Sequence, residues 1–199
     1  ILEGNLDDAI INVNTDPVYG NFNATTSSLL SASNDFDDIW DSAGGCFSAW
    51  IYPKSEGENS THGGRIWDAG TNQIYLSNES SGNLDLFFKH TFTGDDGKWS
   101  TNGTRPIPIN AWTHIAVVYL SASASNNPTF YINGVSVTPT EEDTPTSARD
   151  SDAGTDIFIG AESGAANPSY VFDGYMADVK VYKNVLVTQP QAAALGSKI

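Results

Sequence analysis

The sequence predicts an all-β protein, a sandwich of two antiparallel sheets. Three observations lead to this fold class: short segments that alternate apolar and polar residues, turn-forming Gly, Asn and Asp between them, and almost no helical periodicity. The alternation is clearest over residues 84–89 and 175–181. Strands of this kind bury one face and leave the other face wetter, which suits a two-sheet sandwich.

The expected elements follow one another at short intervals. Strands are predicted at residues 46–52, 64–69, 73–78, 83–92, 112–120, 129–132, 135–138, 156–160 and 175–182. Asn133-Gly134, between two apolar runs, predicts a tight hairpin with a type I′ turn, because both turn residues need a positive φ. Residues 188–196 predict one helical turn that stops at Gly196, and residues 53–63, 93–111 and 138–155 predict long polar loops.

Composition excludes several classes of partner. The net charge is −15, and the basic residues are scattered singly, so neither nucleic acid nor an anionic membrane is a suitable partner. The absence of an apolar run of about 20 residues argues against membrane insertion. Cys46 is the single cysteine, so no internal disulfide is expected. Because the chain begins with Ile1 rather than Met, we expect it to be a processed product or an excised piece of a longer protein.

A series of motifs in a fixed order gives the fold a family. The motifs are CFSAWIYP, AWTHIAVVY, FYINGVSV, DIFIGAE and FDGYMADVKVYKNVLVTQPQAAAL. Together they resemble the laminin-G-like members of the concanavalin A-like lectin/glucanase superfamily, over about residues 28–196. The resemblance implies one jelly-roll domain over residues 1–199, with a convex and a concave sheet and with its first and last strands paired. It also makes Trp50, Trp112 and His114 packing residues.

Catalytic residues are not evident in the sequence. Glycoside hydrolases of this superfamily carry carboxylates at alternate positions of one strand, so that both reach the same face. Here Glu141, Glu142 and Asp143 are adjacent and lie in a predicted polar loop, which favours a solvated acidic segment. We therefore expect a protein that is not an enzyme.

Calcium is the one cofactor that the sequence suggests. The ion takes oxygen ligands, which acidic loops on the rim of a sandwich can supply. A resemblance to the calcium-binding pentraxins implies Asn72 and Glu162 as metal ligands, although Thr71 stands where the pentraxins carry an Asp. A site among Asp35, Asp37, Asp38 and Asp41 is a second interpretation, and simple solvation of these carboxylates is the third.

Aromatic residues outside the packing motifs predict a ligand site. Sugars dock their apolar faces on exposed rings, while carboxylates and amides bind their hydroxyls. The candidate rings are Trp67, Tyr75, Trp99 and Tyr170. Trp99 is the leading one, because it lies in a Gly/Asp/Asn-rich segment with Asp95, Asp96 and Asn102 and has no evident core to enter. The alternative is a Trp that anchors its own loop.

These observations favour a non-catalytic recognition module. It would bind a glycan or another cell-surface ligand as part of an extracellular or virion-surface protein. The first alternative is a structural or assembly domain of a coat, fibre or adhesin, in contact with neighbouring subunits. The second is a polysaccharide-degrading enzyme.

Overall fold

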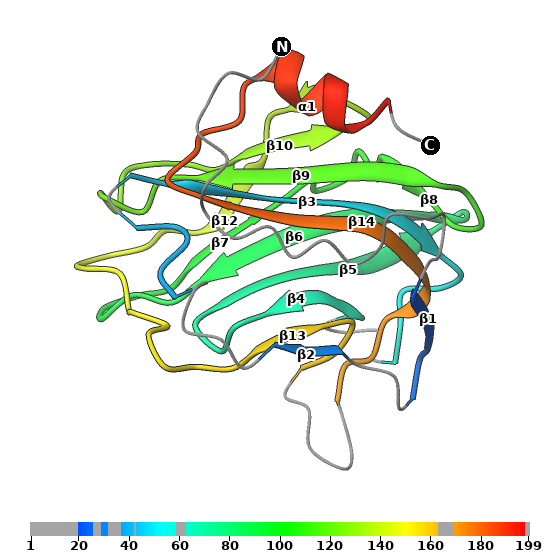
Figure 1. Ribbon diagram of the computed structural model, residues 1–199, viewed down its shortest axis with the longest axis horizontal. Helices are drawn as coiled ribbons and strands as arrows, with labels where there is room; N and C mark the ends of the chain where they lie inside the picture. The colour runs from blue at the N-terminus through cyan, green and yellow to red at the C-terminus, as the bar shows by residue number, and fades with distance from the viewer. Residues whose placement is uncertain are drawn as a thin grey trace.

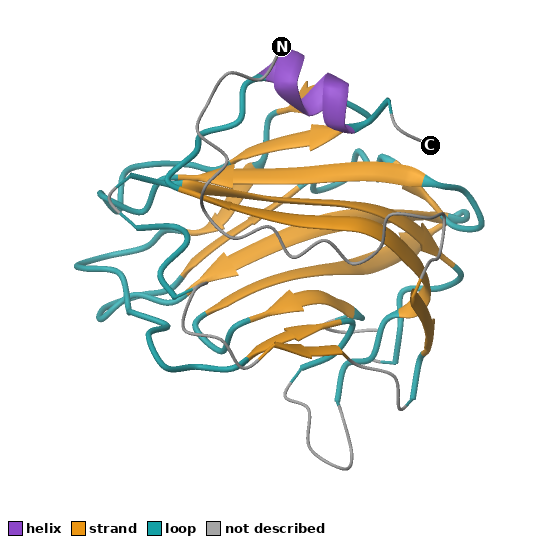
Figure 2. Cartoon of the chain, in the orientation of Figure 1, coloured by secondary structure: helices purple, strands orange, loops and turns teal. Residues whose placement is uncertain are grey.

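Two antiparallel sheets lie face to face in the computed structural model, which describes residues 20–25, 29–31, 37–41, 43–58, 63–162 and 169–197 (Figures 1 and 2). The first sheet has six strands, in the spatial order β1 (Gly20–Asn23), β14 (Asp173–Lys183), β3 (Gly45–Pro53), β9 (Thr113–Tyr119), β10 (Thr129–Ile132) and β11 (Val135–Val137). The second sheet has eight strands, in the order β12 (Thr140–Asp143), β7 (Gly97–Ser100), β6 (Asn83–His90), β5 (Asn72–Ser80), β4 (Arg65–Asp68), β13 (Ile157–Ile159) and β2 (Leu29–Ser31), with β8 (Ile107–Pro108) paired to β6.

The core fills the space between the sheets and is rich in aromatic rings. The largest fully buried side chains include Trp40, Trp67, Trp99, Tyr119 and Phe88. Phe88 lies at the centre of this group, 5.1 Å from the ring of Trp40 and 5.4 Å from that of Tyr119. Aromatic pairs at these distances add to the free energy gained by removing apolar surface from water.

The single helix of the described residues, α1 (Gln189–Leu195), packs on the outer face of the six-stranded sheet (Figure 1). Its Ala192 and Leu195 join Cys46, Val118 and Tyr131 in a second, smaller apolar cluster. Burial raises the pKa of the Cys46 thiol, which is consistent with an inert packing role. No helix in the described part of the chain has the length and apolar character of a membrane span.

The expected sandwich is confirmed, together with each strand predicted from alternation. The first described strand, β1, pairs with the last strand, β14, as the family resemblance implied. Two of the predicted polar loops need correction. Residues 93–111 contain β7 and β8, and residues 138–155 contain β12. These strands are short and β12 is an exposed acidic edge strand, so none of them shows the apolar alternation that predicts a strand.

The hairpin between β10 and β11 has the expected turn. Asn133 and Gly134 have φ values of 50° and 76°, and Ile132 pairs with Val135 across the turn. A β-carbon on Gly134 would lie 2.5 Å from the Cα atom of Ala193, so the turn also provides the surface on which α1 rests. Gly134 is therefore needed for two reasons: it adopts the positive φ of the turn, and its lack of a side chain lets α1 pack against the turn.

Substitution of Gly134 by Val should lower the free energy of unfolding by more than the same change at Gly103. Both glycines have a positive φ, which costs a β-branched residue about 1–3 kcal/mol. Only Gly134 has neighbours that a side chain would strike, since nothing lies within 4 Å of a β-carbon at Gly103. Chemical denaturation of both variants measures the difference. Equal losses would show that α1 does not rest on the turn.

Candidate functional site

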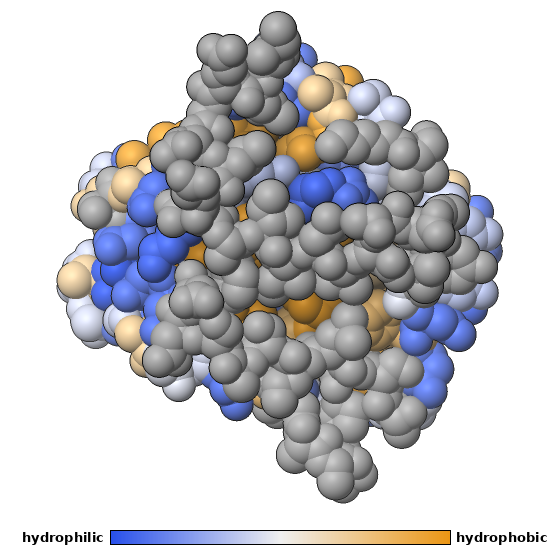
Figure 3. Space-filling model, in the orientation of Figure 1, coloured by the Kyte–Doolittle hydropathy of each residue, from blue (hydrophilic) through white to orange (hydrophobic). Residues whose placement is uncertain are grey.

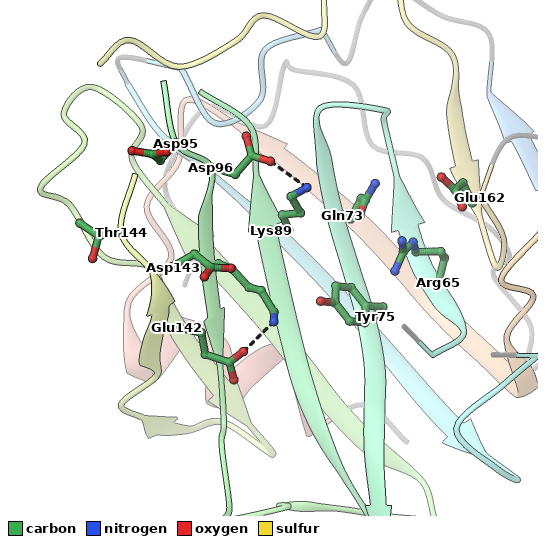
Figure 4. Close-up of a pocket in the computed structure, with 11 residues that line it drawn as sticks. Arg65, Gln73, Tyr75, Lys89, Asp95, Asp96, Glu142, Asp143, Thr144 and Glu162 are labelled. Atoms are coloured by element: carbon green, nitrogen blue, oxygen red, sulfur yellow. Dashed lines mark ion pairs between the residues drawn. The ribbon is translucent and has the colours of Figure 1, made fainter. Parts of the chain in front are cut away.

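A polar pocket of about 770 Å³ opens on the outer face of the eight-stranded sheet (Figure 4). Alternation along the strands creates this face: Ile74 and Phe88 point into the core, while Gln73 and Lys89 point outward. We call it the outer pocket. It is lined by Arg65, Gln73, Tyr75, Lys89, Asp95, Asp96, Lys98, Glu142, Asp143, Thr144 and Glu162.

A stacked aromatic pair lies beneath the charged side chains of the outer pocket. Tyr75 and Phe87 face each other directly across β5 and β6, with ring centroids 5.0 Å apart and planes at 9°. The Arg65 guanidinium lies 4.6 Å from the centre of the Tyr75 ring, and the Lys98 ammonium lies 5.5 Å from that of Phe87. Both rings are therefore covered by cations, and each is only 4% exposed.

Each cation of the outer pocket has a carboxylate partner. Lys89 Nζ lies 2.8 Å from Asp96 Oδ2, and Lys98 Nζ lies 2.8 Å from Glu142 Oε2; both pairs appear as dashed lines in Figure 4. Arg65 Nε lies 3.3 Å from Asp68 Oδ2, in a pair that is almost fully buried. The pocket is thus a surface of paired charges rather than a patch of one sign.

Asp68 supports the pocket from below without lining it. Its side chain is 2% exposed and accepts a hydrogen bond from the backbone N–H of Gly70 at 2.8 Å. Burial raises the pKa of this carboxyl to about 6, against the lowering effects of the Gly70 hydrogen bond and of the Arg65 charge. Burial likewise raises the pKa of the Tyr75 hydroxyl, so this group stays a protonated donor at neutral pH.

The expected exposure of Trp99 is wrong. The residue belongs to β7, its ring is fully buried, and it stacks on Phe88 at 5.9 Å with an interplanar angle of 21°. Its indole Nε1 donates to Asn127 Oδ1 at 2.8 Å. A β-carbon on Gly97 would lie 2.3 Å from the Trp99 ring, so the glycine leaves the space into which the ring folds. Trp99 anchors its segment and offers no surface to a ligand.

The other candidate ligand residues divide into two groups. Tyr75, Asp95 and Asp96 line the outer pocket, where the structure brings them together. Trp67 is fully buried in the core, and Asn102 is exposed in the turn after β7 but does not line the pocket. Tyr170 is half-buried and lies next to Arg65 at the side of the outer pocket.

Tyr170 acts on the pocket through Arg65. The guanidinium lies 4.9 Å from the centre of the Tyr170 ring and 4.6 Å from that of Tyr75, so it is held between the two rings. The Arg65 side chain is consequently almost buried at one wall of the pocket.

Asn72 makes buried packing and hydrogen-bond contacts in this structure. Its Oδ1 accepts hydrogen bonds from Trp40 Nε1 at 3.1 Å and from Trp67 Nε1 at 2.6 Å, and its Nδ2 donates to Asp152 Oδ2 at 2.7 Å. It lies on the core face of β5, whereas Glu162 lines the outer pocket. The implied calcium ligands thus face opposite sides of the sheet and do not form one site.

The acidic rim residues are engaged by protein groups. Arg149 pairs with Asp38 at 2.6 Å and with Asp41 at 3.0 Å, and Asp37 accepts a hydrogen bond from the N–H of Gly154. Asp35 lies outside the described residues. In the described part of the chain, no three His, Cys, Asp or Glu side chains come together as a metal site.

Figure 3 shows hydrophilic side chains gathered on the left of the view, where Figure 1 places the loop after β12.

Sequence reasoning gave no ligand role to most of the charged residues of the outer pocket, which are Arg65, Lys89, Lys98, Glu142 and Asp143, or to Gln73 and Thr144. A signal existed in the alternation, since Gln73 and Tyr75 share a face of β5, as do Phe87 and Lys89 of β6. The alternation does not reveal which strands are neighbours. For that reason the acids of β12 could not be joined to the lysines of β6 and β7.

Comparisons place this fold among known domains. A laminin G family model, described as the concanavalin A-like lectin/glucanases superfamily, matches residues 23–190 and confirms the resemblance carried by the motifs. A comparison of the sequence with curated proteins finds no match.

Solved structures share the fold at low sequence identity. Domain 4 of AbnA, a GH43 extracellular arabinanase from Geobacillus stearothermophilus in complex with arabinotriose, is 20% identical with a TM-score of 0.50; the match covers 81% of this chain and 70% of that one. A mutant of HCR D/C is 12% identical with a TM-score of 0.56, over 95% of this chain and 45% of that one. Mouse laminin α1 domains LG4-5 are 11% identical with a TM-score of 0.49, over 82% and 40%.

Exchanging Asn72 and Asp152 should separate their hydrogen bond from their individual contributions. Asn72→Asp alone places two buried carboxylates against each other and should cost about 3 kcal/mol of unfolding free energy. Adding Asp152→Asn restores a donor and an acceptor, so the double variant should recover most of that loss. Urea denaturation of the two single variants and the double variant gives the coupling energy. Additive losses would contradict a direct interaction.

Calcium titration tests the remaining calcium hypothesis. A ligand selective for the native state raises the melting temperature, so EDTA-treated protein is melted with calcium up to millimolar levels. Because Glu162 and Asn72 do not share a site, any rise should persist in Glu162→Gln. A rise that this substitution abolishes would restore Glu162 as a ligand.

Proposed function

The chain belongs to the concanavalin A-like lectin/glucanases superfamily, and we propose that it is a non-catalytic recognition module that binds a glycan in the outer pocket. The observation that carries this proposal is the composition of that pocket. Paired carboxylates and cations, the amide of Gln73 and the hydroxyl of Thr144 converge on one opening. Such a surface offers donors and acceptors at close spacing, which is what the hydroxyls of a sugar require.

The size of the outer pocket is consistent with an oligosaccharide. Ligand sites typically measure about 300–1,000 Å³, and this one has about 770 Å³. The floor of the pocket is built on β4 to β7, whose inner faces contribute to the core, so it is held by the same packing that holds the fold. The edge strand β12 adds an exposed wall beside β7. Sites on such rigid elements bind with little loss of conformational freedom.

The polar character of the pocket changes how a glycan would be held. Trp67 and Trp99 are buried, and cations cover Tyr75 and Phe87. A sugar ring therefore finds no open aromatic face among these residues, and hydrogen bonds to charged groups provide the affinity. Such bonds are stronger than those between neutral groups.

The surroundings of the module are also part of the proposal. We place it in a larger protein at an extracellular or virion surface, with a glycan or cell-surface ligand as its partner. The same fold occurs as a domain of an extracellular arabinanase, in complex with arabinotriose.

Two alternative functions are separable from this one by simple measurements. A polysaccharide-degrading enzyme would release reducing ends from polymers, whereas Asp68, the carboxyl whose pKa burial raises to about 6, is enclosed below the pocket. An assembly domain would show a defined oligomer in solution. Release of reducing ends, or an oligomer that buries the pocket, would favour these alternatives.

Gln73→Ala should weaken glycan binding about 5- to 30-fold while leaving the melting temperature nearly unchanged. Gln73 lies at the centre of the outer pocket and is half-buried, and losing a bound hydrogen-bonding group costs about 1–2 kcal/mol. A glycan array selects the ligand, and titration calorimetry then measures both proteins. Gln189→Ala, on α1 at the other sheet, is the matched control and should bind like the wild type. Equal loss in both variants would contradict the proposed site.

A further inference from the structure

We infer that the outer pocket selects neutral, hydroxyl-rich glycans and excludes glycans that carry carboxylate or sulfate groups, with Asp143 and Glu162 as the selecting residues. This inference rests on the proposed function and gives it a ligand class. It follows from how the charges of the pocket are paired, and Figure 4 shows the two lysine–carboxylate pairs.

The cations of the pocket are already neutralised. Lys89 and Lys98 each lie 2.8 Å from a carboxylate oxygen. Arg65 is held between two tyrosine rings with Asp68 at 3.3 Å. An incoming carboxylate or sulfate would have to displace one of these partners. It would then leave a carboxylate of the protein without its cation, so the exchange gains little free energy.

Two carboxylates of the pocket, those of Asp143 and Glu162, have neither a cation nor a hydrogen-bond donor as a partner among the described residues, whereas Asp95 lacks a cation but accepts a hydrogen bond from Thr146 Oγ1 at 3.1 Å. The two unpartnered carboxylates lie on opposite sides of the opening, Asp143 at the end of β12 and Glu162 beyond Arg65 (Figure 4). Carboxylates are acceptors only, so they require donors from the ligand. Sugar hydroxyls provide such donors.

The net charge of the described residues that line the pocket and the net charge of the whole chain are both negative, so an anionic ligand is repelled both near the pocket and far from it. The described residues that line the pocket include five carboxylates and three cations. The whole chain carries a net charge of −15. Both the local and the long-range potential therefore repel an acidic glycan and slow its association, more strongly at low salt. A neutral glycan meets neither barrier.

The experiment compares two panels of ligands on the wild-type protein. The neutral panel holds arabinotriose, cellohexaose and mannohexaose, and the acidic panel holds trigalacturonate, sialyllactose and a heparin hexasaccharide. We expect binding in the neutral panel only, with a Kd that changes less than about twofold between low and high salt, since no net charge is exchanged. Binding of the acidic glycans that becomes weaker as salt is added would contradict the proposed selectivity, while the proposal of a glycan-binding module would still hold. Binding of neither panel would overturn both proposals.

Two substitutions that remove negative charges test whether Asp143 and Glu162 cause the preference for neutral glycans. Asp143→Asn with Glu162→Gln keeps the shape of the pocket and removes two charges. We expect neutral-glycan binding to weaken about tenfold or more, because hydrogen bonds to charged acceptors become neutral ones. The same double variant should gain binding of trigalacturonate. Asp156→Asn, an exposed carboxylate that does not line the pocket, is the control and should change neither. An unchanged glycan profile in the folded double variant, with folding checked by circular dichroism, would overturn the role of these residues.

Discussion

The rest of the structure depends on the hydrogen bonds that the side-chain amide of Asn72 makes inside the core. The amide receives the indole N–H groups of Trp40 and Trp67 and donates to Asp152, inside a core where an unpaired polar group would be costly. Asp152 in turn binds the backbone of Asp38, whose carboxylate pairs with Arg149. The network ties the segment around Trp40, the start of β5 and the loop before β13 into one unit. Because Asn72 must face inward, its neighbour Gln73 must face outward, and the floor of the outer pocket follows.

Local sequence patterns were sufficient to predict the strands in which apolar and polar residues alternate. β5, β6 and β14 carry one apolar and one wetter face, and Asn133-Gly134 determines its own turn. The strands that escaped prediction in the polar loops are short. β12 stays polar because it lies at an edge, whereas β7 lies between β12 and β6 and has only four residues, too few to show alternation. Trp99 misled sequence reasoning for a related reason. Polar neighbours surround it in the chain, but its core contacts come from Phe88 and Tyr119 on other strands.

The candidate site was predictable only in fragments. Asp95, Asp96 and Tyr75 were recognised by residue type, whereas Glu162 was expected beside Asn72, which faces the other side of the sheet. The remaining lining residues come from strands far apart in the chain, and their meeting depends on the order β12-β7-β6-β5-β4. Strand order is a property of tertiary packing, so no local pattern encodes it. Of the aromatic residues expected to be exposed, Tyr75 and Tyr170 support the Arg65 guanidinium, whereas Trp67 and Trp99 belong to the core.

The position of β14 has a consequence for how the chain reaches its fold. This strand lies between β1 and β3, so the six-stranded sheet cannot close until residues 173–183 have been synthesised. Until then one edge of β3, whose residues are almost all buried in the final structure, has no partner. Pairing across such long sequence separations slows folding, and an open apolar edge invites association with other chains. In the nascent chain, the edge of β3 that β14 later covers is therefore the place where association with other chains is expected.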